Sequence, residues 1–240
     1  EDAPTGDITT QTCIPHTTTT EASLIAKQHG LFFGANIITA FVRHIDSTGD
    51  ITWNTQDASP VTPNTPICSI KTQQDSILLI ERSMLNIVQK LSGIATLTQE
   101  YIQALNNPNI SICDTRKTTP RLRFLEKEAV VAGGGSNHRH SLSDMILIKE
   151  NHLSSMKKNN QLPNLHTIIL NAKEKNPKLK AEIEIESIDQ LTSLPLSSFD
   201  YIMLDNFTHS QLPEAIAYCR KTYPKTKIEL SGNITLSTIK

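Results

Sequence analysis

The sequence predicts an α/β protein: an N-terminal α+β domain over residues 1–90, followed over residues 91–240 by an open or incomplete parallel α/β barrel. Three observations lead to this fold class. Short runs rich in Thr, Ile and Val, separated by turn residues, fill the first part of the chain and are typical of strands. A stretch with helical spacing follows it. After that, short apolar runs alternate with gaps long enough for helices, which is the pattern of a parallel sheet.

The N-terminal domain is expected to begin with strands and to end in a helix. Segments 37–42 (IITAFV) and 66–70 (PICSI) are predicted to be short strands, because apolar and β-branched residues dominate them. Between residues 74 and 105, apolar residues recur at helical spacing. This spacing predicts one or two helices, with a break near Ser92-Gly93.

The second part of the chain shows a regular alternation. A helix is predicted over residues 213–219, and similar gaps separate the other apolar runs. The predicted strands are residues 110–113, 145–148, 167–170, 181–185, 201–204 and 228–230. Strands that alternate with helices form a parallel sheet, either open or closed into a barrel.

Composition excludes several classes of function. The net charge is −1, so the whole molecule has no electrostatic reason to bind nucleic acid or anionic lipid. The four cysteines form no CxxC pair, which speaks against a zinc site or a disulfide framework. No apolar run approaches the ~20 residues of a membrane helix. We therefore expect a cytoplasmic protein with neither a membrane nor a nucleic acid as partner.

Polar residues follow nearly every predicted strand directly. The segments that follow are 114–117 (DTRK), 149–152 (KENH), Asn171, Glu184 with Glu186, 205–206 (DN) and 231–233 (SGN). The C-terminal ends of parallel barrel strands meet at one rim, where active sites lie. Polar loops alone would explain any one case, but they seldom repeat a charge at the end of each strand. The pattern favours a functional rim.

The cationic part of this rim indicates a small anionic substrate. It consists of Arg116, Lys117, Arg123, His138, Arg139 and Lys149. Arg suits a carboxylate or phosphate bidentately, whereas Lys supplies a point charge. So many cations repel one another unless an anion of matching charge is present. The glycines of 133–135 (GGG) allow close approach of the backbone to a ligand, although they are also typical of a flexible turn.

The acidic part indicates a sugar or Mg²⁺ site. Alternation places Glu182, Glu184 and Glu186 on one face of a strand, with Asp205 nearby. An exposed edge strand is the alternative for this run. Carboxylates beside cations are good ligands for ribose hydroxyls or Mg²⁺. The turn 231–233 is predicted to enter a helix and to bind phosphate. Together the groups point to phosphoribosyl transfer.

At this point the chain resembles a known family, quinolinate phosphoribosyltransferase, a type II phosphoribosyltransferase. The resemblance runs nearly end to end. It rests on Glu1-Asp2, GDITT (6–10), Glu81-Arg82, Leu85-Asn86, SGIAT (92–96), DTRKT (114–118), Glu126-Lys127, GGG (133–135), NHR (137–139), IKENH (148–152), EIE (182–184), LDN (204–206) and Ser231-Gly232. In this order and spacing the motifs are highly specific.

The resemblance implies a reaction and its ligands. Quinolinate and phosphoribosyl pyrophosphate would give nicotinate mononucleotide, pyrophosphate and CO2 in de novo NAD synthesis. Mg²⁺ is expected to arrive with the donor, and no residue is assigned as a dedicated metal ligand.

The resemblance also implies residue roles. Lys117, Glu184 and Asp205 are the implied catalytic residues around the ribose and pyrophosphate. The implied substrate-binding residues are Arg82, Thr115, Arg116, His138, Arg139, Lys149, Ser231, Gly232 and Asn233. Arg82 would enter the site from a second subunit, so a homodimer is expected.

Three features depart from the family pattern. The chain ends at Lys240, before the last barrel strands that the family usually has, and Arg121 and Glu128 stand where Gly and an aromatic residue are usual. Two alternatives remain. One is a related type II phosphoribosyltransferase with another substrate. The other is a catalytically impaired anion-binding protein, against which the presence of Lys117, Glu184 and Asp205 argues.

Overall fold

The structure, a computed structural model, describes residues 2–15 and 18–239. Glu1, part of the first motif of the resemblance, lies outside the described residues. The chain divides into two compact units, one up to His138 and one over Arg139–Ile239. The domain boundary predicted at residue 90 does not coincide with the division at His138 and stays a prediction.

The first unit contains an antiparallel sheet in the order β1-β5-β3. Its strands are β1 (Thr19–Ile25), β5 (Pro66–Gln73) and β3 (Asp50–Trp53), and β2 (Gly30–Leu31) pairs with β4 (Pro60–Val61) in a smaller sheet. The strand predicted at 66–70 is therefore confirmed. In β5, Ile67, Cys68 and Ile70 are buried and form a core with residues of the helices.

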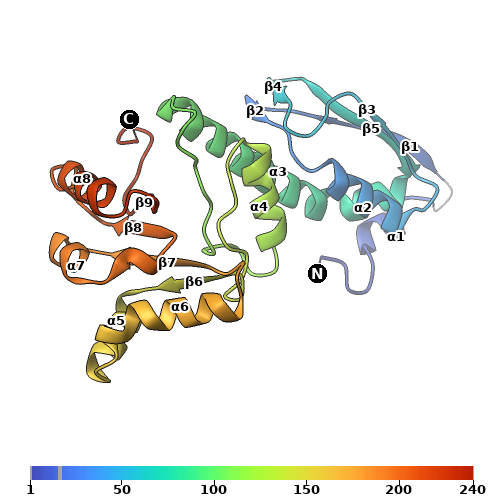
Figure 1. Ribbon diagram of the computed structural model, residues 1–240. Coiled ribbons are helices and arrows are strands. Elements are labelled where there is room, and N and C mark those ends of the chain that lie inside the picture. The colour runs from blue at the N-terminus through green and yellow to red at the C-terminus, as the bar shows by residue number, and fades with distance from the viewer. Residues whose placement is uncertain (1, 16–17, 240) are drawn as a thin grey trace. The chain divides into compact units, whose positions relative to one another are not determined.

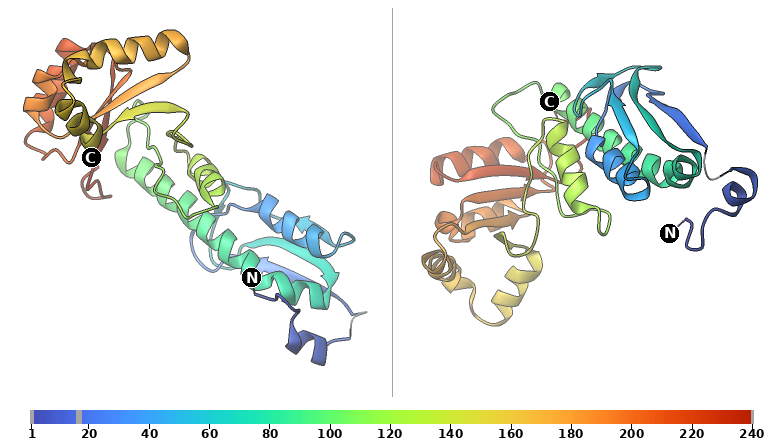
Figure 2. Two further views of the ribbon diagram at one scale, coloured as in Figure 1. Left: turned by 90° about the horizontal axis from the view of Figure 1, so that it is seen from below. Right: turned by 90° about the vertical axis from the view of Figure 1, so that its right-hand side faces the viewer.

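The helices of the first unit are α1 (Ile8–Cys13), α2 (Ala35–Ile45), α3 (Gln74–Leu105) and α4 (Arg123–Ala132). Helices α2 and α3 pack against the sheet (Figure 1), where Ile38, Val42 and Met84 join the core. Helix α3 runs without interruption through Ser92-Gly93, and the left view of Figure 2 shows it as one continuous helix. The predicted break at this point is wrong, because buried residues continue at helical spacing on both sides of it.

The segment predicted as a strand at 37–42 is helical instead. Ile38 and Val42, four residues apart, lie on the buried face of α2. Asp57 Oδ1 accepts hydrogen bonds from the first backbone N–H groups, those of Gly34 (2.8 Å) and Ala35 (3.0 Å). A side chain 22 residues away thus caps the helix, which outweighs the β-branched composition.

The second unit is an open parallel sheet in the order β6-β7-β8-β9 (Figure 1). Its strands are β6 (Met145–Ile148), β7 (Lys180–Ile185), β8 (Tyr201–Asp205) and β9 (Lys227–Ser231). Its helices are α5 (Glu150–Lys158), α6 (Leu165–Lys175), α7 (Ile188–Ser193) and α8 (Leu212–Thr222), with short 3-10 turns η1 (Leu162–Asn164) and η2 (Leu196–Ser198). This confirms an α+β part followed by a parallel α/β part whose barrel is not closed.

The core of the second unit lies between one face of the sheet and the helices. Ala181, Ile183 and Ile185 of β7 pack there against Leu165 and Ile169 of α6. This confirms that alternate residues of β7 face the helices and places the glutamates on the opposite face. Since β7 pairs with β6 and β8, the alternative of an exposed edge strand is wrong.

Three predicted elements of the second part are not formed. Residues 167–170 belong to α6, because Leu165 and Ile169 are buried at helical spacing while Ile168 is exposed. Asn171 therefore does not follow a strand. Segment 110–113 forms only an isolated parallel bridge between Cys113 and Ser136. Residues 234–239 contain turns but no helix, so the predicted helix after 231–233 is absent from the part of the chain that the structure describes.

None of the helices in the described ranges is both long and apolar enough to cross a membrane.

Candidate functional site

The four parallel strands of the second unit end in groups with complementary chemistry. Lys149 follows β6, Glu184 lies near the end of β7, Asp205 ends β8 and Ser231 ends β9. The register pairs Asp205 with Ser231 directly. Because the strands are parallel, these four predicted site residues lie along one edge of the sheet. They bring one cation, two carboxylates and one hydroxyl to it.

Lys149 and Glu184 form an ion pair at this edge. The Lys149 Nζ to Glu184 Oε2 distance is 2.5 Å, and the side chains are 45% and 10% exposed. The backbone N–H of Lys149 donates to Nδ1 of His152 (3.0 Å), which fixes the start of α5. Lys149, which the resemblance implies to bind a carboxylate of quinolinate, is therefore in direct contact with Glu184, which it implies to lie at the ribose. An incoming anion would compete with Glu184 for Lys149.

A second group of carboxylates surrounds Glu184. Oxygens of Glu184, Glu186 and Asp205 lie within 4.8 Å of one another. Burial raises the pKa of Glu186, and the nearby charges of Glu150, Glu184 and Asp205 raise it further. Mutual repulsion of this kind is relieved by a cation, and Mg²⁺ prefers oxygen ligands. These three carboxylates fit Mg²⁺ as ligands. Glu186 was not among the site residues predicted from the sequence.

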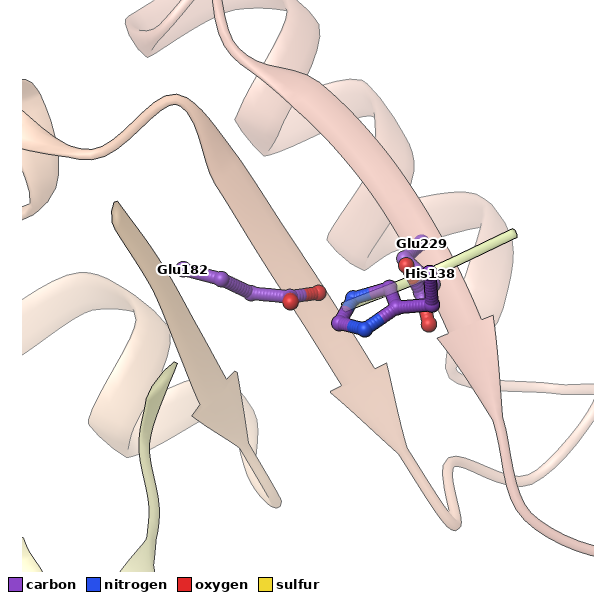
Figure 3. A group of neighbouring side chains, drawn as sticks. All are labelled: His138, Glu182 and Glu229. Atoms are coloured by element: carbon purple, nitrogen blue, oxygen red, sulfur yellow. The ribbon is translucent and has the colours of Figure 1, made fainter. Parts of the chain in front are cut away.

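Glu182 lies deeper than Glu184 on the same face of β7. Its side chain is fully buried, whereas Glu184 is closer to the strand end. The carboxylates of Glu182 and of Glu229 on β9 come within 4.8 Å of one another, and Figure 3 shows Glu182 reaching over the sheet toward Glu229. Depth along the strand therefore separates the two glutamates.

The turn after β9 is tied to the loop after β8. The N–H of Asn206 donates to the carbonyl of Ser231 (2.9 Å), and Nδ2 of Asn233 donates to Oδ1 of Asn206 (3.4 Å). Gly232 has φ +90°, and a Cβ there would lie 2.9 Å from the backbone nitrogen of Asn206. Only glycine fits this turn. Within residues 234–239 no helix follows this turn, so any phosphate there would depend on the amides and hydroxyl of the turn itself.

In the first unit, the predicted anion-binding residues Thr115, Arg116 and Lys117 lie on one loop before α4. The N–H of Lys117 donates to Oγ1 of Thr115 (3.0 Å), so the loop folds back on itself. Nε of Arg116 is buried and has no hydrogen-bond partner among the described residues. A buried guanidinium donor in this condition would be satisfied by an anionic ligand.

A cavity of about 170 Å³ adjoins this loop. Its lining residues are Ile94, Asp114, Thr115, Lys117, Thr118, Glu126, Lys127 and Val130. Asp114 and Lys127 form a buried ion pair. No role was predicted for either residue from the sequence. The signal available was the Glu126-Lys127 motif, where two charged residues stand among the apolar positions of a helix.

The remaining predicted binding residues have these positions. The N–H of His138 donates to Oδ1 of Asp114 (2.9 Å), so its backbone is held next to the 115–117 loop. Arg139, the first residue of the second unit, donates from Nη1 to the carbonyl of Met145 (3.4 Å). Arg82 is exposed on α3. Gly133 brings its backbone against α3, where a Cβ would lie 2.4 Å from the carbonyl oxygen of Ala95. This glycine therefore has a packing role.

Two family models match the chain. The quinolinate phosphoribosyl transferase N-terminal domain matches residues 7–92, and the C-terminal domain of the same family matches residues 94–240. Similar proteins carry corresponding names. The chain is 37% identical to the probable nicotinate-nucleotide pyrophosphorylase (carboxylating) of Bacillus subtilis strain 168, over 100% of this chain and 80% of that protein. It is 32% identical to the nicotinate-nucleotide pyrophosphorylase (carboxylating) of Mycobacterium leprae, over 96% of this chain and 80% of that protein.

A solved structure agrees with these matches. NadC from Streptococcus pyogenes has a TM-score of 0.85 and 34% identity over 97% of this chain and 80% of that one. Both family models, the relatives and the solved structure point the same way, and the chain belongs to the quinolinate phosphoribosyl transferase family.

Proposed function

We propose that this protein is a decarboxylating phosphoribosyltransferase, a pentosyltransferase that converts quinolinate and phosphoribosyl pyrophosphate into nicotinate mononucleotide, pyrophosphate and CO2. Its relatives over most of the chain are named carboxylating nicotinate-nucleotide pyrophosphorylases. The observation that carries the proposal is the edge of the parallel sheet, where Lys149, Glu184, Asp205 and Ser231 lie at or next to the C-terminal ends of four adjacent strands. A dianionic ring, a sugar and a phosphate need these kinds of group.

The acidic residues would act on the donor. Loss of pyrophosphate leaves positive charge on the anomeric carbon of the ribose, and the fixed carboxylates of Glu184 and Asp205 would stabilise that charge. Glu184 is nearly buried, so its electrostatic effect is screened less than that of a surface group. The hydroxyl of Ser231 and the backbone of Gly232 and Asn233 would hold the 5′-phosphate.

The cationic residues would act on the acceptor. Arg116, His138, Arg139 and Lys149 would bind the two carboxylates of quinolinate, with Thr115 beside them. They would orient the ring nitrogen for attack on the ribose carbon. Once the nitrogen is bonded to ribose, the positively charged ring stabilises the electron pair left at C2 when CO2 departs. A proton then replaces the carboxylate at C2. Lys117 would offset the charge of the leaving pyrophosphate.

Mg²⁺ fits the acidic group described above. It would enter with phosphoribosyl pyrophosphate and neutralise part of the pyrophosphate charge. Glu184, Glu186 and Asp205 would hold it through their carboxylate oxygens, which the mutual distances within 4.8 Å allow.

A homodimer and a cytoplasmic location belong to the same proposal. The support for the dimer is Arg82, an exposed cation on α3 to which the family resemblance gives a role in the partner subunit's site. An exposed basic side chain of this kind would be able to reach the active site of a second copy of the chain.

Acceptor choice tests the proposal against the related activity on a monocarboxylate. Purified protein is mixed with phosphoribosyl pyrophosphate, Mg²⁺ and either quinolinate or nicotinate, and pyrophosphate release is measured. We expect release with quinolinate and at least about 100-fold less with nicotinate, because a cation that loses its carboxylate partner is left unpaired in the site. Faster release with nicotinate would replace the proposal with the related activity. Release with neither would leave an anion-binding protein.

A further inference from the structure

We propose that Glu126 and Lys127, adjacent residues on α4, are positioning residues that hold the 115–117 loop at both of its ends. The proposal deepens the function proposed above and rests on it, because it assigns to these residues the geometry of the quinolinate-binding cations. Neither side chain needs to touch a substrate for this role.

Lys127 holds the beginning of the loop. Its side chain is fully buried and forms an ion pair with Asp114, the residue before Thr115. Nζ of Lys127 also donates to the carbonyl of His138 (3.1 Å), while the N–H of His138 donates to Oδ1 of Asp114 (2.9 Å). One ammonium group therefore joins the start of the 115–117 loop to the backbone of His138.

Glu126 holds the end of the loop. Its Oε2 accepts a hydrogen bond from the N–H of Thr119 (3.1 Å), and its Oε1 lies 3.3 Å from Nζ of Lys90 on α3. Burial by itself raises the pKa of Glu126, but the bonds from Thr119 and the charge of Lys90 hold the pKa below its usual value. The carboxylate is therefore ionised at neutral pH and links α3 to the loop through α4.

The two contacts together fix both ends of a short loop. Residues 115–118 lie between Asp114 and Thr119, so few backbone angles remain free once both ends are bound. A third contact comes from Nε of Arg123 at the start of α4, which donates to Oγ1 of Thr118 (3.0 Å). Arg123, Glu126 and Lys127 all lie on α4, and Asp114 forms its ion pair with Lys127.

Stability alone does not account for these charges. A buried ion pair contributes little compared with apolar residues of the same volume, because desolvation offsets the attraction between the charges. Directed charge-assisted hydrogen bonds, in contrast, fix atoms in defined positions. Misplacing a binding group by about 1 Å can cost about 100-fold in rate. The arrangement is therefore explained by placement of Thr115, Arg116 and Lys117.

The first experiment compares three variants of α4: Glu126→Ala, Glu126→Gln and the matched control Glu128→Ala. Glu128 is exposed on the same helix, next to Lys127. Glutamine keeps an acceptor for the N–H of Thr119, whereas alanine removes it. Quinolinate dissociation constants are measured by calorimetry well below each melting temperature. We expect about 10-fold or greater weakening for Glu126→Ala, and substantial rescue for Glu126→Gln. The control should bind as wild type does.

The second experiment separates positioning from stability. Lys127→Met leaves Asp114 buried without its partner and should lower the melting temperature. The double variant Lys127→Met/Asp114→Asn removes both charges and should recover much of the melting temperature. We expect quinolinate binding to stay weakened in the double variant, because the connection to the carbonyl of His138 is still missing. Recovery of binding together with stability would show a structural role only and would overturn the proposal.

A readout without substrate keeps this test independent of the proposed function. Amide hydrogen exchange at Thr119 and His138 reports the two ends of the loop directly. We expect faster exchange at Thr119 in Glu126→Ala and at His138 in Lys127→Met, with no change in Glu128→Ala. Unchanged exchange in both α4 variants would overturn the proposal. If the wild-type protein does not bind quinolinate but the two variants show the expected faster exchange, the proposed function is refuted and the proposed loop contacts stand.

Discussion

Glu182 and Glu184 lie on the same face of β7 at different depths along the strand. Glu182 and Glu184 share the inner face of β7, but Glu182 is fully buried whereas Glu184 lies nearer the strand end and contacts Lys149. Composition and alternation cannot separate the two residues. Position along a parallel strand separates them, because the functional edge is the one where the strands end.

We expect Glu184→Gln to lower turnover at saturating substrates while quinolinate binding stays nearly intact. The amide preserves shape but lacks the charge that matters when positive charge develops on ribose. Glu182→Gln should lower turnover less. Steady-state kinetics on both variants, with thermal melts as a control for folding, checks this expectation. If both remain folded and Glu182→Gln is the slower enzyme, the ribose site lies one strand pleat deeper than proposed.

Arg121 carries a backbone conformation that suits glycine. Its φ is +67°, in the left-handed region that favours glycine. A left-handed conformation costs a residue with a Cβ ~1–2 kcal/mol. Glycine recovers this cost but loses ~0.5–1 kcal/mol through the entropy of the unfolded chain.

We therefore expect Arg121→Gly to raise the free energy of unfolding by about 0.5–1 kcal/mol. Asn160→Gly is the matched control, because Asn160 is also left-handed (φ +54°) and asparagine tolerates that region. Urea unfolding of both variants gives the comparison. An equal gain in both, or a loss at Arg121, would mean that the arginine side chain offsets the backbone cost.

The helices and strands that depend on a local sequence pattern could be predicted from the sequence. The strands β6 to β9 and helix α8 follow from apolar runs and gaps of the expected length. Helices α2 and α6 were predicted as strands because short β-branched runs do not reveal their period. Capping by Asp57 and burial of Ile169 against β7 decide these cases, and both depend on residues distant in sequence.

The candidate site was predictable to a similar degree. Charges directly after strands indicated Lys149 and Asp205, because parallel strands gather their ends at one edge. The Asp114–Lys127 pair and the contact between Glu126 and Thr119 were not predicted. Their partners lie 13 and 7 residues apart, in a loop and a helix whose packing no sequence period encodes.

Asp200, the residue before β8, links α6 and β7 through its carboxylate. Its carboxylate lies 2.7 Å from Nζ of Lys173 on α6 and 3.1 Å from Nζ of Lys180 on β7, and it accepts the N–H of Ala181 (2.9 Å). Burial by itself raises the pKa of Asp200, but Lys173, the N–H of Ala181 and Lys180 hold the pKa below its usual value. Its contribution to stability is therefore present above the unfolded pKa of ~3.9 and is lost as pH falls through the lower folded pKa.

We expect Asp200→Asn to lower the melting temperature at pH 7, with a loss on the order of 1 kcal/mol. The difference from wild type should shrink as the pH falls below about 4, because the wild-type carboxyl is then protonated as well. Melting curves between pH 3 and pH 7 measure it, with Glu174→Gln, an exposed change on α6, as the control. A difference that does not depend on pH would contradict the role of the charge.

At the scale of the whole molecule, the proposal requires two copies of the chain. Arg82 is exposed on α3, and its proposed role is in the partner subunit's site. Arg82→Ala and Lys117→Ala should each be inactive as pure proteins. Mixed and allowed to exchange subunits, they should regain about a quarter of wild-type activity, since half the dimers are hybrids and each hybrid has one intact site. No recovery after verified exchange would place Arg82 in its own subunit's site, and full activity of pure Arg82→Ala would place it outside any site.

Release of labelled CO2 reports on the proposed decarboxylation itself. Quinolinate labelled in its 2-carboxylate is incubated with the protein and Mg²⁺, with and without phosphoribosyl pyrophosphate, and the label is followed into gas and into nicotinate mononucleotide. We expect one CO2 for each pyrophosphate released, no CO2 without the donor, and loss of both products in Lys117→Ala. CO2 release that does not need the donor, or pyrophosphate release without CO2, would contradict the proposed function.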